Sequence, residues 1–283
     1  MSLKIETAAV AGAGAMGLGI AQVFAQAGFK TLLYDLNPEQ LAKAAKTITA
    51  NLDGAVSKGK LTEAAKNEIL GRLSFVTEVS DLRADIVVEA VVEKLEVKQQ
   101  LFTGLAAINT GQTILASNTS SIPITRIAHG IANPERVVGM HFFNPAHIMK
   151  LVEVISGAET STEVANTVKE LTVKLGKVPV MCTDSPGFIV NRVARHYYVE
   201  ALKMLEERAA TMENIDALME SAGFKMGPFK LMDMLGNDVN FAVTSSLYES
   251  FHQEPKFRPS RIQQQKVEAG HLGKKTGKGF YSY

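Results

Sequence analysis

The stretch Val10-Ala11-Gly12-Ala13-Gly14-Ala15-Met16-Gly17 decides the fold of the first half of the chain. It follows a short apolar segment, residues 8–10, and opens a helical pattern that runs to about residue 28. This order predicts a strand, a glycine turn and a helix. In such a turn the first glycine permits the tight bend, the second lets the backbone approach a pyrophosphate, and the third lets the helix pack close to the strand.

The predicted helix offers its first backbone N–H groups and the positive end of its dipole to an anion. A second strand, residues 31–34, ends at Asp35, 18 residues after Gly17, where a carboxylate can accept hydrogen bonds from an adenosine ribose. Strand, turn, helix and acid therefore predict a dinucleotide site; the alternative is a plain βαβ unit whose glycines only shape the turn. The residues of the predicted site are Gly12, Ala13, Gly14, Ala15, Met16, Gly17 and Asp35.

The charge of Asp35 bears on the choice of cofactor. A carboxylate repels the 2′-phosphate of NADP, and the next residues, Leu36 and Asn37, bring no positive charge to attract one. The sequence therefore favours NAD over NADP.

Composition sets the class of protein. The 283 residues suffice for one large or two medium domains. The net charge is +1 and the sequence shows no patch that combines basic and aromatic residues, so we expect no nucleic-acid partner. No uncharged apolar run reaches the length of a membrane span, and the first residues lead directly into the first strand, so we expect neither a membrane segment nor a signal or transit peptide. Cys182 is the single cysteine, which excludes an internal disulfide and suits the cytoplasm; we expect it to be a small buried residue.

Extended and helical patterns alternate over the first two thirds of the chain, and the patterns are helical from about residue 189 to the end. The alternation predicts a doubly wound, mostly parallel α/β sheet of the Rossmann type, followed by a smaller all-helical domain. Pro186 and Gly187 mark the boundary, so we expect an NAD-binding domain over residues 1–185 and a helical domain over 186–283. The expected strands lie at residues 8–10, 31–34, 85–90, 113–117, 137–142, 151–155 and 178–181, and the expected helices at 15–28, 38–58, 61–70, 94–108, 124–129, 161–175, 189–205, 212–223 and 229–248.

Five further motifs follow in order: residues 117–121 (SNTSS), 139–145 (GMHFFNP), 150–155 (KLVEVI), 184–192 (DSPGFIVNR) and 273–281 (GKKTGKGFY). With the glycine turn they resemble the 3-hydroxyacyl-CoA dehydrogenase family over nearly the whole chain, and the length is most similar to the single-function bacterial 3-hydroxybutyryl-CoA dehydrogenases. The resemblance implies an N-terminal NAD domain, a C-terminal helical dimerisation domain, and interconversion of (S)-3-hydroxyacyl-CoA and 3-ketoacyl-CoA with NAD. It favours short acyl chains.

His141 and Glu153 are the candidates for proton chemistry. His141 ends a predicted strand, where open α/β sheets build their sites, and a histidine can take and return a proton near neutral pH. Glu153 interrupts an apolar strand, and pairing with His141 would relieve its burial and orient the imidazole. From the residues alone, His141 could be a structural group and Glu153 could lie on a solvated strand face; the resemblance implies a catalytic pair.

The resemblance also implies four residues that bind substrate. Ser120 and Asn191 are expected to hold the reacting oxygen or the thioester and to complete the catalytic set; a helix cap for Ser120, and a turn or cap for Asn191, are the alternatives. Lys58 matches a family position that meets the CoA phosphates. Asn51 stands where some relatives have serine and is the second expected CoA contact.

Four more residues are expected near the cofactor. Glu93 and Lys98 follow the strand at 85–90 and could reach the ribose and nicotinamide side, although both also fit ordinary solvated helix charges. Asn118 follows the strand at 113–117 and is expected at the nicotinamide ribose, and Lys275 matches a family lysine near the cofactor.

Other chemistries find little support. The histidines lack the paired spacing of a metal site, and neither a GxSxG turn nor a Ser-His-Asp arrangement indicates hydrolysis. Three rival functions stay open: a dehydrogenase of free hydroxy acids, a non-catalytic NAD(H) sensor, and a structural subunit with a degenerate site. We expect a cytoplasmic homodimer that forms through the helical domain. The apolar residues compatible with this interface are Ile189, Val193, Leu202, Met226, Phe229, Leu231 and Met234.

Overall fold

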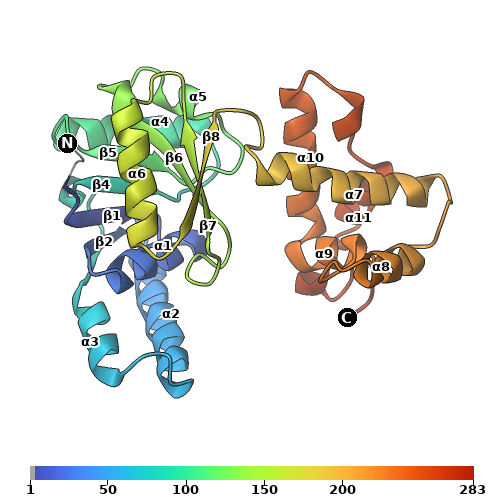
Figure 1. Ribbon diagram of the computed structural model, residues 1–283, viewed down its shortest axis with the longest axis horizontal. Helices are drawn as coiled ribbons and strands as arrows, with labels where there is room; N and C mark the ends of the chain where they lie inside the picture. The colour runs from blue at the N-terminus through green and yellow to red at the C-terminus, as the bar shows by residue number, and fades with distance from the viewer. Residues whose placement is uncertain (1–3) are drawn as a thin grey trace. The chain divides into compact units, whose positions relative to one another are not determined.

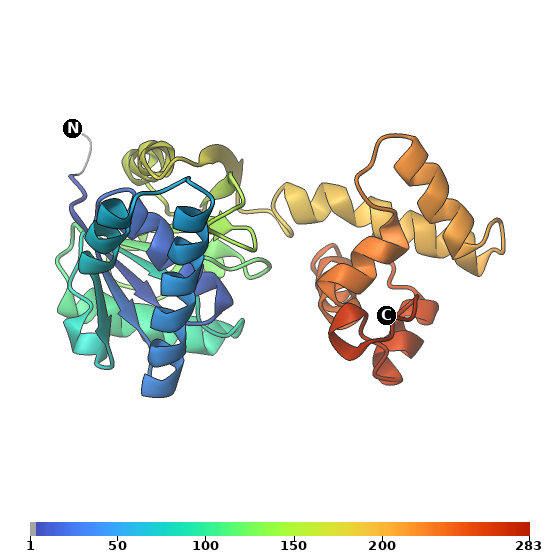
Figure 2. The same cartoon turned by 90° about the horizontal axis from the view of Figure 1, so that it is seen from below.

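The computed structural model describes residues 4–283, which divide into two compact units, residues 4–185 and 186–283. The first unit combines a sheet with helices on both of its faces, and the second is built from helices (Figures 1 and 2). The predicted α/β fold followed by a helical part is therefore confirmed.

The first unit contains an eight-stranded sheet in the order β3-β2-β1-β4-β5-β6-β7-β8. Its neighbouring strands are parallel, except that β6 and β7 are antiparallel. The carboxyl ends of β1, β4, β5 and β6 consequently meet at one edge, the usual ligand-binding edge of a doubly wound sheet. The strands are β1 (Thr7–Ala11), β2 (Lys30–Tyr34), β3 (Leu73–Val76), β4 (Ile86–Glu89), β5 (Ile114–Ser117), β6 (Val137–Phe142), β7 (Leu151–Ser156) and β8 (Val178–Thr183).

The helices of the first unit begin where the sequence supplies caps. Asn37, Thr62 and Ser161 each accept a hydrogen bond from a backbone N–H in the first turn of the helix that follows. The helices are α1 (Ala15–Gln26), α2 (Pro38–Ser57), α3 (Glu63–Gly71), α4 (Leu95–Ile108), α5 (Ile124–Ala128) and α6 (Thr162–Lys174), with short 3₁₀ turns at Val79–Asp81 and Pro134–Arg136.

The main core of the first unit packs α1, α2 and α6 against the sheet. Ile20 and Phe24 of α1, Ile48 of α2 and Val168 of α6 are fully buried in it. Because β1, β4, β5 and β6 are buried almost throughout, polar side chains at their ends are held by a rigid scaffold.

The second unit comprises α7 (Val190–Glu206), α8 (Met212–Ser221), α9 (Pro228–Leu235), α10 (Asn237–Ser250) and α11 (Arg261–Glu268), with 3₁₀ turns at Pro255–Phe257 and Lys274–Thr276. Leu202, Phe229, Met232 and Phe280 lie in its core. Among the helices of residues 4–283, none combines the length and apolar character that a membrane crossing requires.

Two expectations about the second unit were wrong. The single helix expected over residues 229–248 is divided between α9 and α10, because Gly236 adopts φ of +101° and interrupts the helix. The chain is also not helical to its end. Phe280 and Tyr281 donate their backbone N–H groups to Asp233, each at 2.9 Å, which ties the last residues to α9.

Candidate active site

The glycine turn after β1 has the shape of a pyrophosphate site. A Cβ atom on Gly12 would lie 2.6 Å from the carbonyl oxygen of Ala90, and one on Gly17 would lie 1.7 Å from the carbonyl oxygen of Gly12. A Cβ atom on Gly14 would meet nothing within 4 Å, so the space beside that backbone is open. Helix α1 begins at this point with neither a side-chain cap nor an acidic residue in its first turn. Its first N–H groups and open surroundings fit the pyrophosphate of NAD.

Asp35 is fixed beside the turn. Its Oδ2 atom accepts a hydrogen bond from Ala13 N at 2.9 Å, and its Oδ1 atom accepts one from Asn37 N at 3.0 Å. The side-chain amide of Gln40 also donates a hydrogen bond to the carbonyl oxygen of Ala13, at 2.8 Å. The carboxylate is thus held next to the backbone that would carry the pyrophosphate, as a ribose contact requires.

A buried ion pair lies at the carboxyl end of β4. The ammonium of Lys98 is 2.7 and 2.8 Å from the two carboxylate oxygens of Glu89, and the two side chains are 1% and 0% exposed. The hydroxyl of Ser117 also donates to Glu89. The interpretation of Lys98 as a solvated helix charge is therefore wrong. Sequence reasoning missed Glu89, whose signal was a carboxylate on the last residue of a buried strand.

Glu93 connects this ion pair to the loop after β5. Its Oε2 atom lies 3.1 Å from Lys98, and its Oε1 atom accepts hydrogen bonds from Thr119 Oγ1 at 2.6 Å and from Ser120 N at 2.9 Å. Burial alone would raise the pKa of Glu93, but Lys98 and these hydrogen bonds outweigh it and hold the pKa below its usual range. Glu93 therefore fixes the loop that carries Ser120. Ser120 is not a helix cap, because α5 begins at Ile124 after Pro123.

Asn118 joins the ends of two strands. Its side-chain oxygen accepts a hydrogen bond from Phe142 N at 2.8 Å, and its own N–H donates to the carbonyl oxygen of Glu89 at 2.9 Å. Asn118 is thereby placed between the end of β4 and the end of β6, and its partner Phe142 directly follows His141 in the chain.

His141 and Glu153 form the central contact of the candidate site. The Nδ1 atom of His141 lies 2.7 Å from Oε2 of Glu153, and the side chains are 7% and 1% exposed. The ring of His141 also lies against Phe143, with 4.5 Å between ring centroids. Glu153 is not on a solvated strand face, and the expected pairing of the two side chains is present in the structure.

Asn191 and Lys275 lie in the second unit. Asn191 is in the first turn of α7, whose cap residue is Ile189, so Asn191 does not cap the helix. The ammonium of Lys275 is 2.6 Å from Oδ1 of Asp238. Burial would raise the pKa of Asp238, but its hydrogen bond with Lys275 helps to lower it.

The two expected CoA contacts are on or next to α2. The side-chain amide of Asn51 donates to Gln22 Oε1 at 3.0 Å, which links α2 to α1. Lys58 follows the last turn of α2 and is exposed.

Cys182 is half-buried in β8, opposite Ile155 of β7. Burial, and next the charges of Glu153 and Asp184, raise the pKa of its thiol to about 12. A thiol in this state is a poor nucleophile. In the described part of the chain, no three His, Cys, Asp or Glu residues are grouped so that they could hold a metal ion.

Two family models together match nearly the whole chain. The family model described as "3-hydroxyacyl-CoA dehydrogenase, NAD binding domain" matches residues 7–185, and the one described as "3-hydroxyacyl-CoA dehydrogenase, C-terminal domain" matches residues 187–283. An Escherichia coli K12 protein named 3-hydroxyadipyl-CoA dehydrogenase is 53% identical over 100% of this chain, which spans 60% of that relative. A Deinococcus radiodurans protein named probable 3-hydroxybutyryl-CoA dehydrogenase is 44% identical, with 97% of this chain and 99% of the relative covered.

The solved structures agree with these relatives. The crystal structure of (S)-3-hydroxybutyryl-CoA dehydrogenase from Ralstonia eutropha matches with a TM-score of 0.96 and 40% identity, covering 99% of both chains. The present chain thus belongs to the 3-hydroxyacyl-CoA dehydrogenase family, with the NAD-binding domain of that family in residues 7–185 and its C-terminal domain in residues 187–283.

Proposed function

We propose that this protein interconverts (S)-3-hydroxyacyl-CoA and 3-ketoacyl-CoA by hydride transfer with NAD. The observation that carries the proposal is the buried contact of His141 with Glu153 at the edge of the sheet that also bears the glycine turn. A histidine oriented by a carboxylate, next to a nicotinamide site, suits proton exchange with a secondary alcohol.

The chain's own residues would bind the cofactor and move the proton. The backbone at Gly12–Gly17 would hold the pyrophosphate and Asp35 the adenosine ribose, and bound NAD supplies the hydride chemistry. Glu93 and Asn118 would face the nicotinamide side. Lys98 would act through Glu89 and Glu93, because its ammonium is buried against both carboxylates.

His141 is the proposed base. Its Nδ1 atom faces Oε2 of Glu153. With Nδ1 as the protonated nitrogen of the neutral ring, Nε2 would take the hydroxyl proton and Glu153 would stabilise the imidazolium. In the reverse direction the same nitrogen would return the proton to the ketone oxygen. Ser120 and Asn191 would hydrogen-bond that oxygen or the thioester.

The acyl group is proposed to be short. Relatives that span the full length of this chain are named 3-hydroxybutyryl-CoA dehydrogenases, whereas the 53% identical relative is named for a hydroxyadipyl group, which ends in a carboxylate. Lys58 and Asn51 are proposed contacts of the CoA part. Such an activity would serve fatty acid metabolism in the cytoplasm.

A homodimer formed through the second unit is also proposed. Of the apolar residues expected at this interface, Leu202 and Phe229 are buried in the unit's own core, but Val193 is 67% and Met234 is 49% exposed. A subunit contact would cover such exposed apolar side chains if they form one contiguous patch. Light scattering on the purified protein tests this, with Val193→Asp expected to yield monomers.

The function is tested by following NADH consumption with acetoacetyl-CoA, 3-oxohexanoyl-CoA, 3-oxoadipyl-CoA and free acetoacetate. We expect turnover of the thioesters alone. Comparison of the first two substrates reports on chain length, and comparison of the second with the third reports on the terminal carboxylate. Turnover of the free acid but of no thioester would assign the protein to hydroxy acids. NADH binding without any turnover would indicate a sensor.

A further inference from the structure

A cavity of about 340 Å³ lies in the first unit, outside the contacts described above. It is bordered by the second half of α1, the loop from β6 to β7, and the end of α6. The ionisable residues that line it are all basic: His147, Lys150, Lys174 and Lys177. A lining of this kind attracts anions.

Lys177 is the fixed member of the group. It is only 9% exposed, and its ammonium donates to the carbonyl oxygens of Ala146 at 2.6 Å and Met149 at 2.8 Å. A lysine ammonium carries three donors, so one N–H remains beyond these two carbonyl contacts. Burial, and then the charge of Lys150, lower the pKa of Lys177.

The positive charge of the cavity is not balanced by carboxylates. In residues 4–283, none of Lys150, Lys174 and Lys177 forms an ion pair, in contrast to Lys98 and Lys275. Burial lowers the pKa of His147, and the charge of Lys177 lowers it further. The positive charges of these neighbouring side chains thus repel one another, and an anion bound in the cavity would reduce that repulsion.

Two residues that line the cavity are neighbours, along the chain, of residues in the proposed substrate site. Lys150 immediately precedes β7 and is three residues from Glu153, roughly 10 Å along an extended strand. At its other side the cavity reaches Gln26, one helical turn after Gln22, which binds Asn51. The lining residue Gln26 is thus one helical turn from the residue that contacts Asn51, a proposed CoA contact.

We propose that this cavity binds phosphate groups of the CoA part of the substrate, with Lys177 as a fixed donor and Lys150 and Lys174 as cations at its mouth. The inference rests on the proposed function and adds three lysines to Lys58 and Asn51. Phosphate is the ligand chemistry that clustered ammonium groups without carboxylates suit best.

The test compares two thioesters that share the reacting group. Acetoacetyl-CoA carries phosphates, and acetoacetyl-pantetheine carries none. In Lys150→Gln/Lys174→Gln we expect KM for acetoacetyl-CoA to rise about tenfold with kcat unchanged, as suits the loss of charge-assisted contacts. KM for acetoacetyl-pantetheine should stay the same. The rise in KM for acetoacetyl-CoA in the variant should become smaller at high ionic strength.

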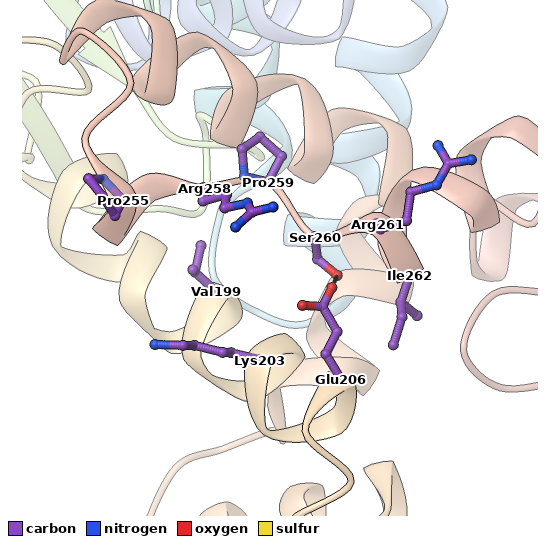
Figure 3. A pocket seen from close by; sticks show the side chains of 9 residues that line it. All are labelled: Val199, Lys203, Glu206, Pro255, Arg258, Pro259, Ser260, Arg261 and Ile262. Carbon is purple, nitrogen blue, oxygen red and sulfur yellow. Dashed lines mark hydrogen bonds between the residues drawn. The ribbon is translucent and has the colours of Figure 1, made fainter.

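A second cavity supplies the matched control. In the second unit, Lys203 and Arg258 line a cavity of about 300 Å³, where Ser260 donates to the carboxylate of Glu206 (Figure 3). Lys203→Gln/Arg258→Gln removes the same amount of charge from the protein. It should leave both KM values unchanged, so that a general effect of net charge is separated from a local one.

Two outcomes would overturn the inference. If KM for both thioesters is unchanged in Lys150→Gln/Lys174→Gln, the cavity does not bind CoA. Loss of inorganic pyrophosphate binding by the same variant would then assign the cavity to a free phosphate compound. If both KM values rise equally, the lysines act on the fold and not on phosphates. Failure of the proposed function is distinguishable, because the unaltered protein would then turn over neither thioester.

Discussion

His141 and Glu153 are direct cross-strand partners: the antiparallel register of β6 and β7 places them opposite each other, with Nδ1 2.7 Å from Oε2. Their neighbours in the register, Met140 with Val154 and Phe142 with Val152, are buried and apolar. The change of strand direction between β6 and β7 is thus what brings a carboxylate to the histidine near the ligand-binding edge.

This pairing predicts a large loss of turnover in His141→Gln and in Glu153→Gln. Glutamine at position 141 removes the base, and glutamine at position 153 removes the charge that stabilises the imidazolium. We expect kcat for acetoacetyl-CoA reduction to fall roughly 10²- to 10⁴-fold in each variant, with the Kd for NADH nearly unchanged. Glu159→Gln, at an exposed position just beyond β7, is the control. A kcat within twofold of the unaltered protein in either variant would refute the assigned role.

The glycine turn predicts opposite results for two alanine substitutions. Gly14→Ala places a methyl group in open space, so the protein should fold and yet bind NADH at least tenfold more weakly, because the methyl group occupies the pyrophosphate position. Gly17→Ala places the methyl group 1.7 Å from a carbonyl oxygen and should lower the melting temperature or prevent folding. Gly54→Ala, inside α2 and also without neighbours, controls for backbone effects. Unaltered NADH binding in Gly14→Ala would place the pyrophosphate elsewhere.

Much of this site could be predicted because its parts are local. The glycine turn, the strand before it and Asp35 lie within one βαβ unit, and the apolar setting of Glu153 pointed to a buried partner. The order of alternating strands and helices was enough to expect a doubly wound sheet. Each inference depended on periodicity or on short spacing, which a single sequence carries directly.

The features that escaped prediction depend on contacts between distant segments. Lys98 follows a helical pattern typical of solvated charges, and only its position beside Glu89 in the folded unit buries it. Strand β3 has four residues, two of them exposed, so its pattern is too short to detect. Gly236 divides a helix because it takes a positive φ, although isolated glycines also occur within continuous helices.

The thiol of Cys182 should react slowly in the folded protein. Its pKa is raised to about 12, so at pH 8 almost all of it is the unreactive protonated form. We expect alkylation by iodoacetamide to be roughly a thousandfold slower than in the urea-unfolded protein, and to accelerate with pH beyond pH 10. Mass spectrometry of timed samples measures this. Equal rates in the folded and unfolded protein would show that the thiol is not perturbed, and full activity of Cys182→Ser would separate it from catalysis.

The ion pair of Lys98 with Glu89 predicts a stability effect that removal of both charges partly reverses. Lys98→Met leaves the Glu89 carboxylate buried without its ammonium partner, so the free energy of unfolding of the first unit should fall by about 3–5 kcal/mol. Glu89→Gln/Lys98→Met removes the uncompensated charge and should recover much of that loss of stability. Glu93, which accepts a hydrogen bond from Ser120 N, still loses its cation in this variant. We therefore expect the loop that carries Ser120 to bind substrate less well. Urea unfolding followed by circular dichroism measures the first effect, and KM measures the second. Arg261→Met, which breaks an exposed ion pair with Glu268, should leave the unfolding midpoint almost unchanged. If the double variant is no more stable than Lys98→Met, the loss comes from packing around the lysine stem and not from the buried charge.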